Sequence, residues 1–348
     1  MTLKQLFISA AAATILLSSP GNAQVAADLA AGPGIGAGPA APKTPAGTVI
    51  IGNNLWVGDE AQGLRHYIPA DPNNTDPLNT GQLQFDSTPN WSVGGGSCAL
   101  WCSVGQAAQD GSTRAYLAVY DHTKGQPGNF GGGGVWMITF PSLAELTIGV
   151  FLQASPVASS LGLSGDLPTA VALGPEGKLY VGFLKNGNIK RVVNPSAPNG
   201  SPTQTVESVG GTPSGRPMRA MAFLGADLYV ATDQGLAVVH NAATCIGNTG
   251  GCGNAAPVVD GLVNVAHVGL TTDGASKVYF SAAGSVYRYT PADKRVVLVS
   301  AGFAFSDAHD NMLTLDPFGN LWVGDDPTDL NFSGRLWRIP AASLATVQ

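Results

Sequence analysis

The stretch LDPFGNLWVGDDP, residues 315–327, contains a phrase that occurs a second time near the other end of the chain, as NNLWVGDE at residues 53–60. The two copies place their tryptophans, Trp56 and Trp322, 266 residues apart. Each copy reads as a polar turn, a short apolar strand and a closing aspartate, which is typical of a strand bounded by turns. Such a distant repetition indicates that the chain builds one structural unit several times.

Four further copies lie between these two. All six share a turn, a strand with an aromatic residue near its start, a short polar or glycine turn, and a second strand. An apolar strand precedes most copies and a more polar strand follows many of them, so the unit has four antiparallel strands. Four strands repeated every ~40–50 residues are the signature of a propeller blade. The repeated aromatic residues are Trp56, Tyr116, Tyr180, Tyr229, Tyr279 and Trp322.

The repeat therefore predicts an all-β protein, a six-bladed β-propeller of four-stranded antiparallel blades. One such sheet alone exposes two apolar faces, whereas sheets stacked around an axis cover them, and we expect the repeated aromatics to fill the space between blades. We assign the strands QLQFDS (82–87) and CALWCSVG (98–105) to blades 1 and 2, which leaves six blades rather than seven. For ring closure, we expect the tail after Pro340 to supply a short outer strand, with Thr48–Ile51 pairing inside blade 1.

The N-terminal region divides into two segments before this domain. Residues 1–23 have one lysine, an apolar run too short to cross a bilayer, and small residues before Ala23, which predicts a cleaved secretory signal peptide. Residues 24–47 are dominated by Ala, Gly and Pro and are expected to form a flexible leader. We expect a single propeller domain over residues 48–348, in a protein that is secreted or periplasmic.

Composition excludes several classes of partner. Only 11% of the residues are charged, against about 25% in an average globular protein, and the formal net charge is −6. Because nucleic acids and anionic membranes attract clustered Lys and Arg, we expect neither as a partner. No later segment is apolar for long enough to span a membrane, so an integral membrane protein is not expected. We expect a monomer that binds a small molecule, a glycan or a protein.

Four cysteines occur as two close pairs. In an exported protein this even count predicts the disulfides Cys98–Cys102 and Cys245–Cys252, each closing a local loop. A site made by four thiolates is the alternative. The spacings of three and six residues within the pairs do not match the usual pattern of structural zinc sites, so we favour disulfides.

The segments LTLDPFGNLWVGD and VALGPEGKLYVGF resemble the NHL-type repeat. The likeness extends more loosely to gluconolactonase-like, streptogramin-lyase-like and strictosidine-synthase-like six-bladed propellers, and it covers residues 48–348 as a repeat pattern. The resemblance implies the fold, while function has to be argued from the site. Gluconolactonase-like enzymes carry an E-G-P motif in the first blade. None of Glu60, Glu145, Glu176 and Glu207 lies in such a motif.

Polar residues gather just before the expected inner strands, which line the channel of a propeller. They form the candidate ligand-binding site at a channel mouth: Asp166, Arg219, His267, His309 and Asp310. Converging imidazoles and carboxylates can bind a divalent metal ion or act as a base and its orienting partner. A solvated polar loop is the alternative interpretation of the segment SDAHDN. For Asp59, Asp233 and Asp325, which directly follow strands, we expect hydrogen bonds that cap turns.

Two functions compete on this evidence. The first is an exported binding module that uses one polar face of the propeller, and the absence of a complete catalytic set in the sequence favours it. The second is a metal-dependent lyase or lactone hydrolase with His267, His309 and Asp310 around one divalent ion. Streptogramin-lyase-like enzymes pair two histidines with a glutamate around magnesium, and no glutamate falls at a matching place here. Whether the protein is an enzyme is therefore left open between these two.

Overall fold

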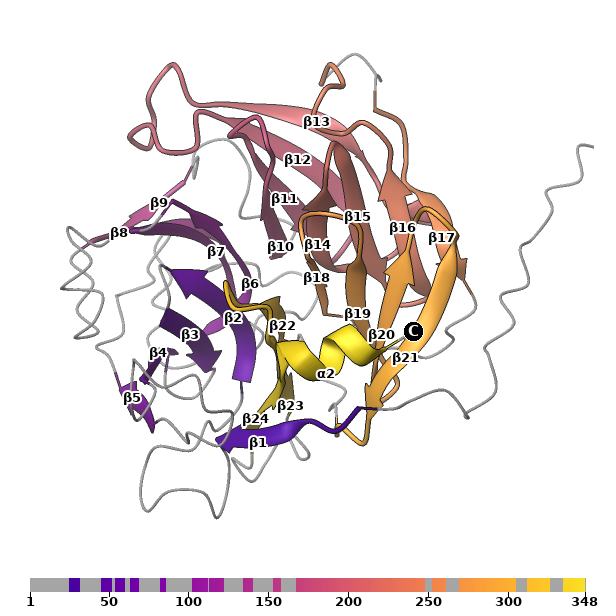
Figure 1. Ribbon diagram of the computed structural model, residues 1–348. Helices are drawn as coiled ribbons and strands as arrows, with labels where there is room; N and C mark the ends of the chain where they lie inside the picture. Colours follow the sequence, from indigo (N-terminus) through magenta and orange to yellow (C-terminus); the bar gives the residue numbers. More distant parts are fainter. Residues whose placement is uncertain are drawn as a thin grey trace, which may run out of the picture.

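The computed structural model describes residues 25–31, 45–51, 54–59, 63–68, 82–85, 102–111, 113–121, 134–139, 153–157, 167–247, 252–260, 269–304, 312–325 and 334–347. The strands among these residues pair into six four-stranded sheets arranged around a centre (Figure 1). Within every sheet the neighbouring strands run antiparallel. The predicted all-β class and the four-stranded antiparallel blade are confirmed.

Five blades consist of four consecutive strands. Blade 1 contains β2 (Pro45–Ile51), β3 (Asn54–Asp59), β4 (Gly63–Ile68) and β5 (Gln82–Phe85). Blade 2 contains β6 (Cys102–Asp110), β7 (Arg114–Asp121), β8 (Gly134–Thr139) and β9 (Gln153–Pro156). Blade 3 contains β10 (Pro168–Leu173), β11 (Leu179–Phe183), β12 (Asn188–Val193) and β13 (Thr205–Gly211).

Blades 4 and 5 follow the same plan. Blade 4 contains β14 (Met218–Leu224), β15 (Asp227–Thr232), β16 (Gly235–Val239) and β17 (Ala256–Asp260), preceded by the 3₁₀ turn η3 (Pro213–Gly215). Blade 5 contains β18 (Leu270–Thr272), β19 (Val278–Ala282), β20 (Ser285–Thr290) and β21 (Arg295–Ala301). Residues 82–85 and 102–105 lie in blades 1 and 2, where the sequence placed them.

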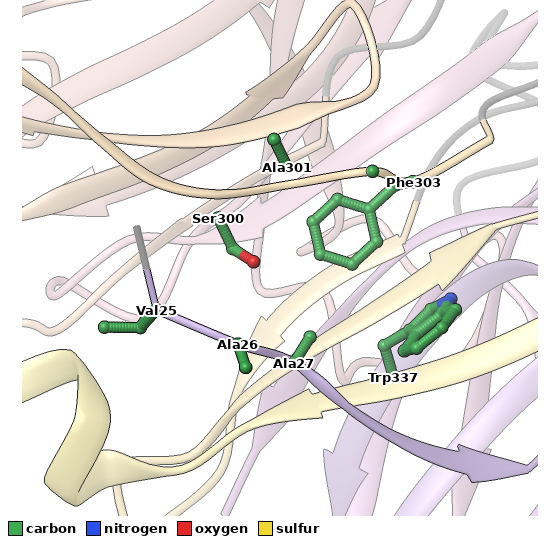
Figure 2. Close-up of a pocket in the computed structure, with 8 residues that line it drawn as sticks. Val25, Ala26, Ala27, Ser300, Ala301, Phe303 and Trp337 are labelled. Carbon is green, nitrogen blue, oxygen red and sulfur yellow. The ribbon is translucent and has the colours of Figure 1, made fainter. Parts of the chain in front are cut away.

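Blade 6 joins the two ends of the chain in one sheet. Its inner strands are β22 (Met312–Leu315), β23 (Leu321–Asp325) and β24 (Arg335–Ile339), and its outermost strand is β1 (Asp28–Ala31). Ahead of β1, the Val25 N–H donates to the Val299 carbonyl of blade 5 at 2.9 Å, and Val25–Ala27 lie near Trp337 of β24 (Figure 2). The N-terminal segment thus spans blades 5 and 6 and closes the ring.

This closure differs from the expected one. The tail after Pro340 forms the short helix α2 (Ala341–Thr346) instead of an outer strand, because Ala and Leu favour helix and a preceding proline is compatible with a helix start. Residues 28–31 form a strand although they lie in the segment 24–47 expected to be a flexible leader. The open edge of β24 supplies the backbone partners that composition could not reveal. The expected pairing of Thr48–Ile51 inside blade 1 is confirmed.

The innermost strands make successive contacts around the ring. The contacting pairs are β2 with β6, β6 with β10, β10 with β14, β14 with β18, β18 with β22, and β22 with β2. Residues between the sheets form the core. Tyr180 of blade 3 is buried and meets the Phe223 ring of blade 4 edge-on, with ring centroids 4.8 Å apart. The ring centroids of Tyr229 of blade 4 and Tyr289 of blade 5 lie 6.2 Å apart. For these repeated tyrosines, the predicted filling between blades is confirmed.

Other predictions can be compared with the described residues only in part. The disulfide Cys245–Cys252 is present, with its Cα atoms 5.3 Å apart. The pairing Cys98–Cys102 and the signal peptide 1–23 lie outside the described side chains and stay predictions, as do the domain boundaries. No helix in the described part of the chain combines the length and apolar character needed to span a bilayer.

We expect the N-terminal strand to be required for full stability. A mature protein that begins at residue 32 loses β1 and its pairing with β24, and it should be destabilised by about 2–4 kcal/mol, since each net hydrogen bond contributes about 0.5–1.5 kcal/mol. The freed edge of β24 should also promote self-association. Thermal unfolding and size-exclusion chromatography, compared with a protein that begins at residue 24, measure both effects.

The matched control is Asp28→Ala, which keeps the strand and removes only the contact of 3.8 Å between Asp28 and Arg338. The Arg338 side chain is 11% exposed and the Asp28 side chain 38%, so this long, half-buried contact should contribute about 1 kcal/mol, still less than the loss of the whole strand. Equal stability of the chains that begin at residues 24 and 32 would contradict closure by β1.

Candidate functional site

The inner strands of the propeller run in the same direction around the channel. Thr169, near the start of β10, donates through Oγ1 to the carbonyl of Met218 at the start of β14, at 2.9 Å. Thr272, at the end of β18, donates to the carbonyl of Phe223 near the end of β14, at 2.7 Å. The starts of neighbouring inner strands therefore lie at the same level along the channel, and so do their ends. The channel has one mouth where these strands begin and another where they end.

Gln106 of β6 reaches across the channel. Its Nε2 donates to the Met221 carbonyl of β14 at 2.6 Å, and its Oε1 accepts from the Met221 N–H at 2.8 Å. The same Nε2 lies 3.4 Å from the carbonyl oxygen of Leu270 of β18. Blade 2 is thereby linked to blades 4 and 5, on the far side of the ring. The carboxamide satisfies backbone groups that an inner edge strand would leave unpaired.

A β-bulge aims this side chain. In the pairing of β6 with β7, Val104 lies opposite Val119 and Ala107 opposite Leu117, so two residues, Gly105 and Gln106, face the single residue Ala118. Bulges of this kind redirect a side chain and are common beside functional sites.

A cavity of about 700 Å³ opens at the mouth where the inner strands end. This mouth lies below Gln106, because Gln109 of β6 lines the cavity and follows Gln106 by three residues, about 10 Å along a strand. The remaining walls come from blades 5 and 6 and from α2. The described lining residues are Gln109, Thr272, Asp273, Gly274, Lys277, Tyr279, Leu315, Asp316, Pro317, Gly319, Ala341, Leu344 and Ala345.

Three groups in this cavity are available to a ligand. Burial raises the pKa of Tyr279, so its hydroxyl is a neutral donor at physiological pH, and no described residue is hydrogen-bonded to it. Gln109 uses Nε2 to donate to the Gly111 carbonyl at 2.8 Å, which leaves its Oε1 as an acceptor. Lys277 adds an ammonium group to which no described residue is hydrogen-bonded. Together they offer donors and an acceptor from two blades.

The two carboxylates in the cavity wall are held by their own turns. Asp273 Oδ1 accepts from the backbone N–H groups of Ala275, Ser276 and Lys277. Burial acts to raise the pKa of Asp273, but these three bonds outweigh it and lower the pKa, so the group stays ionised. Asp316 accepts from two backbone N–H groups, from the side chain of Asn320 and from Nε1 of Trp322. Both carboxylates therefore shape the rim by fixing turns.

Most of the site residues predicted from sequence cannot be compared with this cavity. Asp166, His267, His309 and Asp310 lie outside the described residues, so their convergence stays a prediction. Arg219 is described: it is half-buried on β14 and occupies the extra position of a bulge between Met218 and Ala220. That position is at the mouth where the strands begin. Arg219 is not among the residues that line the cavity at the other mouth.

The two described aspartates that follow strands behave differently. Asp325 is fully buried, accepts a bidentate ion pair from Arg335 at 2.8 and 2.6 Å, and accepts from the Ala304 N–H at 2.9 Å. Its described backbone partner is Ala304, 21 residues earlier in the chain, and not the turn that follows β23. That turn lies outside the described residues, so the expected capping of it stays a prediction. Asp233 does not cap its turn, which Thr232 does instead. Its Oδ1 is buried without a hydrogen-bond partner among the described residues.

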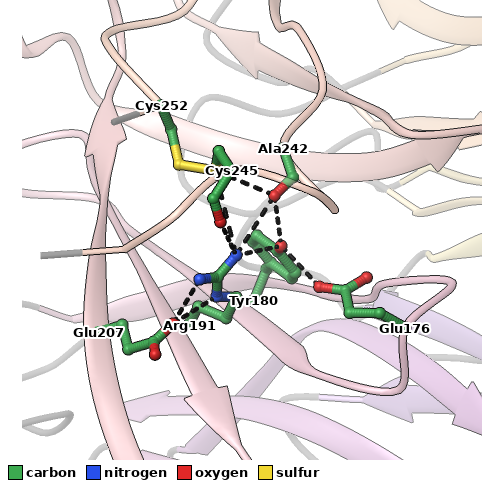
Figure 3. Close-up of polar contacts among 7 residues, drawn as sticks. All are labelled: Glu176, Tyr180, Arg191, Glu207, Ala242, Cys245 and Cys252. Carbon is green, nitrogen blue, oxygen red and sulfur yellow. Dashed lines mark hydrogen bonds and ion pairs between the residues drawn. A yellow bond between two sulfur atoms is a disulfide. The ribbon is translucent and has the colours of Figure 1, made fainter. Parts of the chain in front are cut away.

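A second polar cluster joins blades 3 and 4 and is structural. Arg191 is 2% exposed and donates to Glu207, to the Tyr180 hydroxyl at 3.1 Å and to the Cys245 carbonyl at 3.1 Å (Figure 3). The Tyr180 hydroxyl in turn lies 2.7 Å from Glu176, and burial raises its pKa. Because the buried cation and its partners are mutually satisfied, this cluster fixes the disulfide loop and offers no site.

Sequence reasoning missed the cavity at the strand ends. A signal was present in SVGQAAQD, where Gln106 and Gln109 interrupt an otherwise apolar inner strand. In the described part of the chain, no group of three or more His, Cys, Asp or Glu residues could hold a metal ion.

The comparisons with known proteins support the fold. No family model and no curated protein matches the chain. Among solved structures, it is similar to regucalcin, a calcium-binding protein from Agrobacterium tumefaciens, with 14% identity over 86% of this chain and 90% of that one and a TM-score of 0.54. An auxiliary nutrient binding protein from Bacteroides thetaiotaomicron shows 12% identity over 85% of this chain and 69% of that one, with a TM-score of 0.50.

The chain spans only 32% of the extracellular domain of another Bacteroides thetaiotaomicron protein, which it matches over 86% of its own length with 15% identity and a TM-score of 0.46. At these identities the likeness is one of fold. The resemblance to gluconolactonase-like propellers, expected from the repeat, is confirmed at that level.

Gln106→Leu should destabilise the protein. The substitution leaves the N–H and carbonyl of Met221 without their partner in a partly buried place, at a cost of about 1–3 kcal/mol. Gln109→Leu, three residues along the same strand, removes an exposed side chain and should change stability by less than about 0.5 kcal/mol. Urea unfolding of the two variants measures the difference, and a Gln106→Leu protein as stable as Gln109→Leu would contradict the bridging role.

Proposed function

We propose that this six-sheet ring is an exported binding module that holds a small, hydroxyl-rich ligand at the channel mouth. The observation that supports this most directly is the cavity of about 700 Å³ at the mouth where the inner strands end, which we call the hub cavity. Its volume lies within the range of ~300–1,000 Å³ usual for ligand sites. Because Gln106 crosses the channel above it, we infer that the cavity ends blindly and is a site rather than a passage.

The chemistry of the cavity favours a small polyol or sugar among the ligand classes considered. Tyr279, Gln109 and Lys277 provide donors and an acceptor, while Pro317, Leu344 and Ala345 provide apolar surface. A sugar matches this mixture because it carries hydroxyl groups at its edge and C–H groups on its faces. One similar structure is described as a nutrient binding protein, which is compatible with such a role.

Export and a monomeric state belong to the same proposal. The disulfide Cys245–Cys252 is expected to persist in an oxidising compartment, in agreement with the predicted signal peptide. Closure of the ring by β1 pairs the last open sheet within the chain itself, which supports a monomer.

Titration calorimetry of the mature protein with a panel of neutral mono- and disaccharides tests the site. Tyr279→Phe should weaken binding of a positive sugar about 2- to 12-fold, the equivalent of one net hydrogen bond of 0.5–1.5 kcal/mol. Lys178→Ala is a control for non-specific effects, since Lys178 follows the equivalent turn of blade 3 and does not line the cavity. Binding that responds equally to both substitutions, or no binding across the panel, would reject the site.

We also propose a second candidate, a metal-dependent lyase or lactone hydrolase at the opposite mouth, with His267, His309 and Asp310 around one divalent ion. Two observations favour it. The strands β18 and β22, which these residues precede in sequence, are neighbours in the ring. Asp233, in the turn between β15 and β16, carries a buried carboxylate oxygen with no partner among the described residues. Asp166 and Arg219 would then contact the substrate.

Metal analysis of the purified protein separates the two candidates. If the protein is the proposed metal-dependent enzyme, the purified protein should contain about one divalent ion per chain. This ion should be lost in His309→Ala and retained in His240→Ala. His240 is a suitable control because it is exposed and pairs with Asp227 at 3.0 Å, away from the inner strands. Trace metal that is the same in both variants would leave the binding module as the function.

A further inference from the structure

A second cavity lies where the N-terminal segment closes the ring, separate from the hub. It has a volume of about 380 Å³ and lies between Val25–Ala27, the end of β21 and β24. Figure 2 shows the Phe303 and Trp337 rings on one side of it and the three N-terminal residues on the other. The described lining residues are Val25, Ala26, Ala27, Ser300, Ala301, Gly302, Phe303 and Trp337.

The chemistry of this cavity differs from that of the hub. All its described lining residues are uncharged. Arg335 lies over the Trp337 ring at 5.2 Å and is neutralised by its bidentate pair with Asp325. The Phe303 and Trp337 rings meet edge to face, with centroids 6.0 Å apart, and form an apolar wall. A charged ligand would lose its hydration here without gaining a partner, so the cavity suits a neutral one.

One polar side chain is directed into this apolar space. Ser300 is 2% exposed, and its hydroxyl points toward the gap between Ala26 and the Phe303 ring (Figure 2). Its side chain has no hydrogen-bond partner among the described residues. The Ser300 hydroxyl opens onto the cavity, so it can donate to or accept from a bound molecule. A ligand with a single hydroxyl group would satisfy it.

The position of the cavity connects it to ring closure. Val25–Ala27 form one wall, and they are held to blade 5 by the hydrogen bond from the Val25 N–H to the Val299 carbonyl. The opposite walls belong to blades 5 and 6. A molecule in the cavity would contact both sides, so it would bind the closed ring and not a ring with the N-terminal segment detached. Ligands that bind one state selectively stabilise that state.

We propose that this cavity, which we call the closure pocket, binds a small, neutral, mainly apolar molecule bearing one hydroxyl group, and that its occupation holds the N-terminal segment in place. The apolar body packs against Phe303 and Trp337, and the hydroxyl pairs with Ser300. This site is independent of the one proposed at the hub.

The probes are p-cresol, which carries one hydroxyl, and p-xylene, which has nearly the same shape without it. Ligand-observed NMR on the mature protein should detect binding of both. Ser300→Ala should weaken p-cresol about 2- to 12-fold and leave p-xylene unchanged, because it removes one hydrogen bond. Ala27→Leu should abolish binding of both by filling the pocket. Ser208→Ala on the outer strand of blade 3 is the control, and it should bind both probes as the wild type does.

Hydrogen exchange tests the link to closure without relying on any variant. Saturating p-cresol should slow exchange of the amides of residues 25–31 in the wild-type protein and should leave those of the Asp273–Lys277 turn unchanged. No binding of either probe at millimolar concentration would overturn the proposal. Binding that is insensitive to both Ser300→Ala and Ala27→Leu, or bound p-cresol without protection of residues 25–31, would do the same.

Discussion

The structure depends on covering the apolar faces of every sheet, which is possible only if the sheets close into a ring. Each four-stranded sheet packs both faces against neighbours, and an unclosed set would leave two faces and an edge exposed to water. Pairing of β1 with β24 meets this requirement by placing the first and last described strands of the chain in one sheet. Blade 6 cannot be completed until the whole chain is available, so the stability of all the blades is tied to this contact.

A second constraint arises at the hub. Six inner strands present backbone groups to the channel, and unpaired groups of this kind are costly when water is excluded. Threonine side chains satisfy some of them locally, as Thr169 and Thr272 do for neighbouring strands. Gln106 instead satisfies Met221 from across the ring, since a bulge turns it inward. The side chain that crosses the channel thus also stabilises its wall.

The repeated sequence segment was sufficient to predict the four-stranded blade and the aromatic residues that pack between blades, because both follow from local periodicity. Tyr180 and Tyr229 occupy equivalent places since the same packing problem recurs in each wedge. Closure could not be predicted in this way: DLAA has no strand signal of its own and acquires one from the free edge of β24. The cavity at the hub was missed for a similar reason. Gln106 and Gln109 are ordinary strand residues in sequence, and only the three-dimensional arrangement brings them to Met221 and to α2.

Both cavities occur where the molecule departs from its repeat. A regular wedge is filled by the next blade, as the fully buried strands β11, β16 and β19 show. The hub cavity is walled by α2, a helix where the tail was expected to add a strand, and the closure pocket is walled by Val25–Ala27, which precede the strand that completes blade 6. Such elements cannot match the shape of a blade, so space is left beside them. The repeated blades pack tightly and stabilise the ring, whereas α2 and Val25–Ala27, which do not belong to the repeat, leave cavities beside them. Binding sites in this chain are therefore best sought at these non-repeating segments.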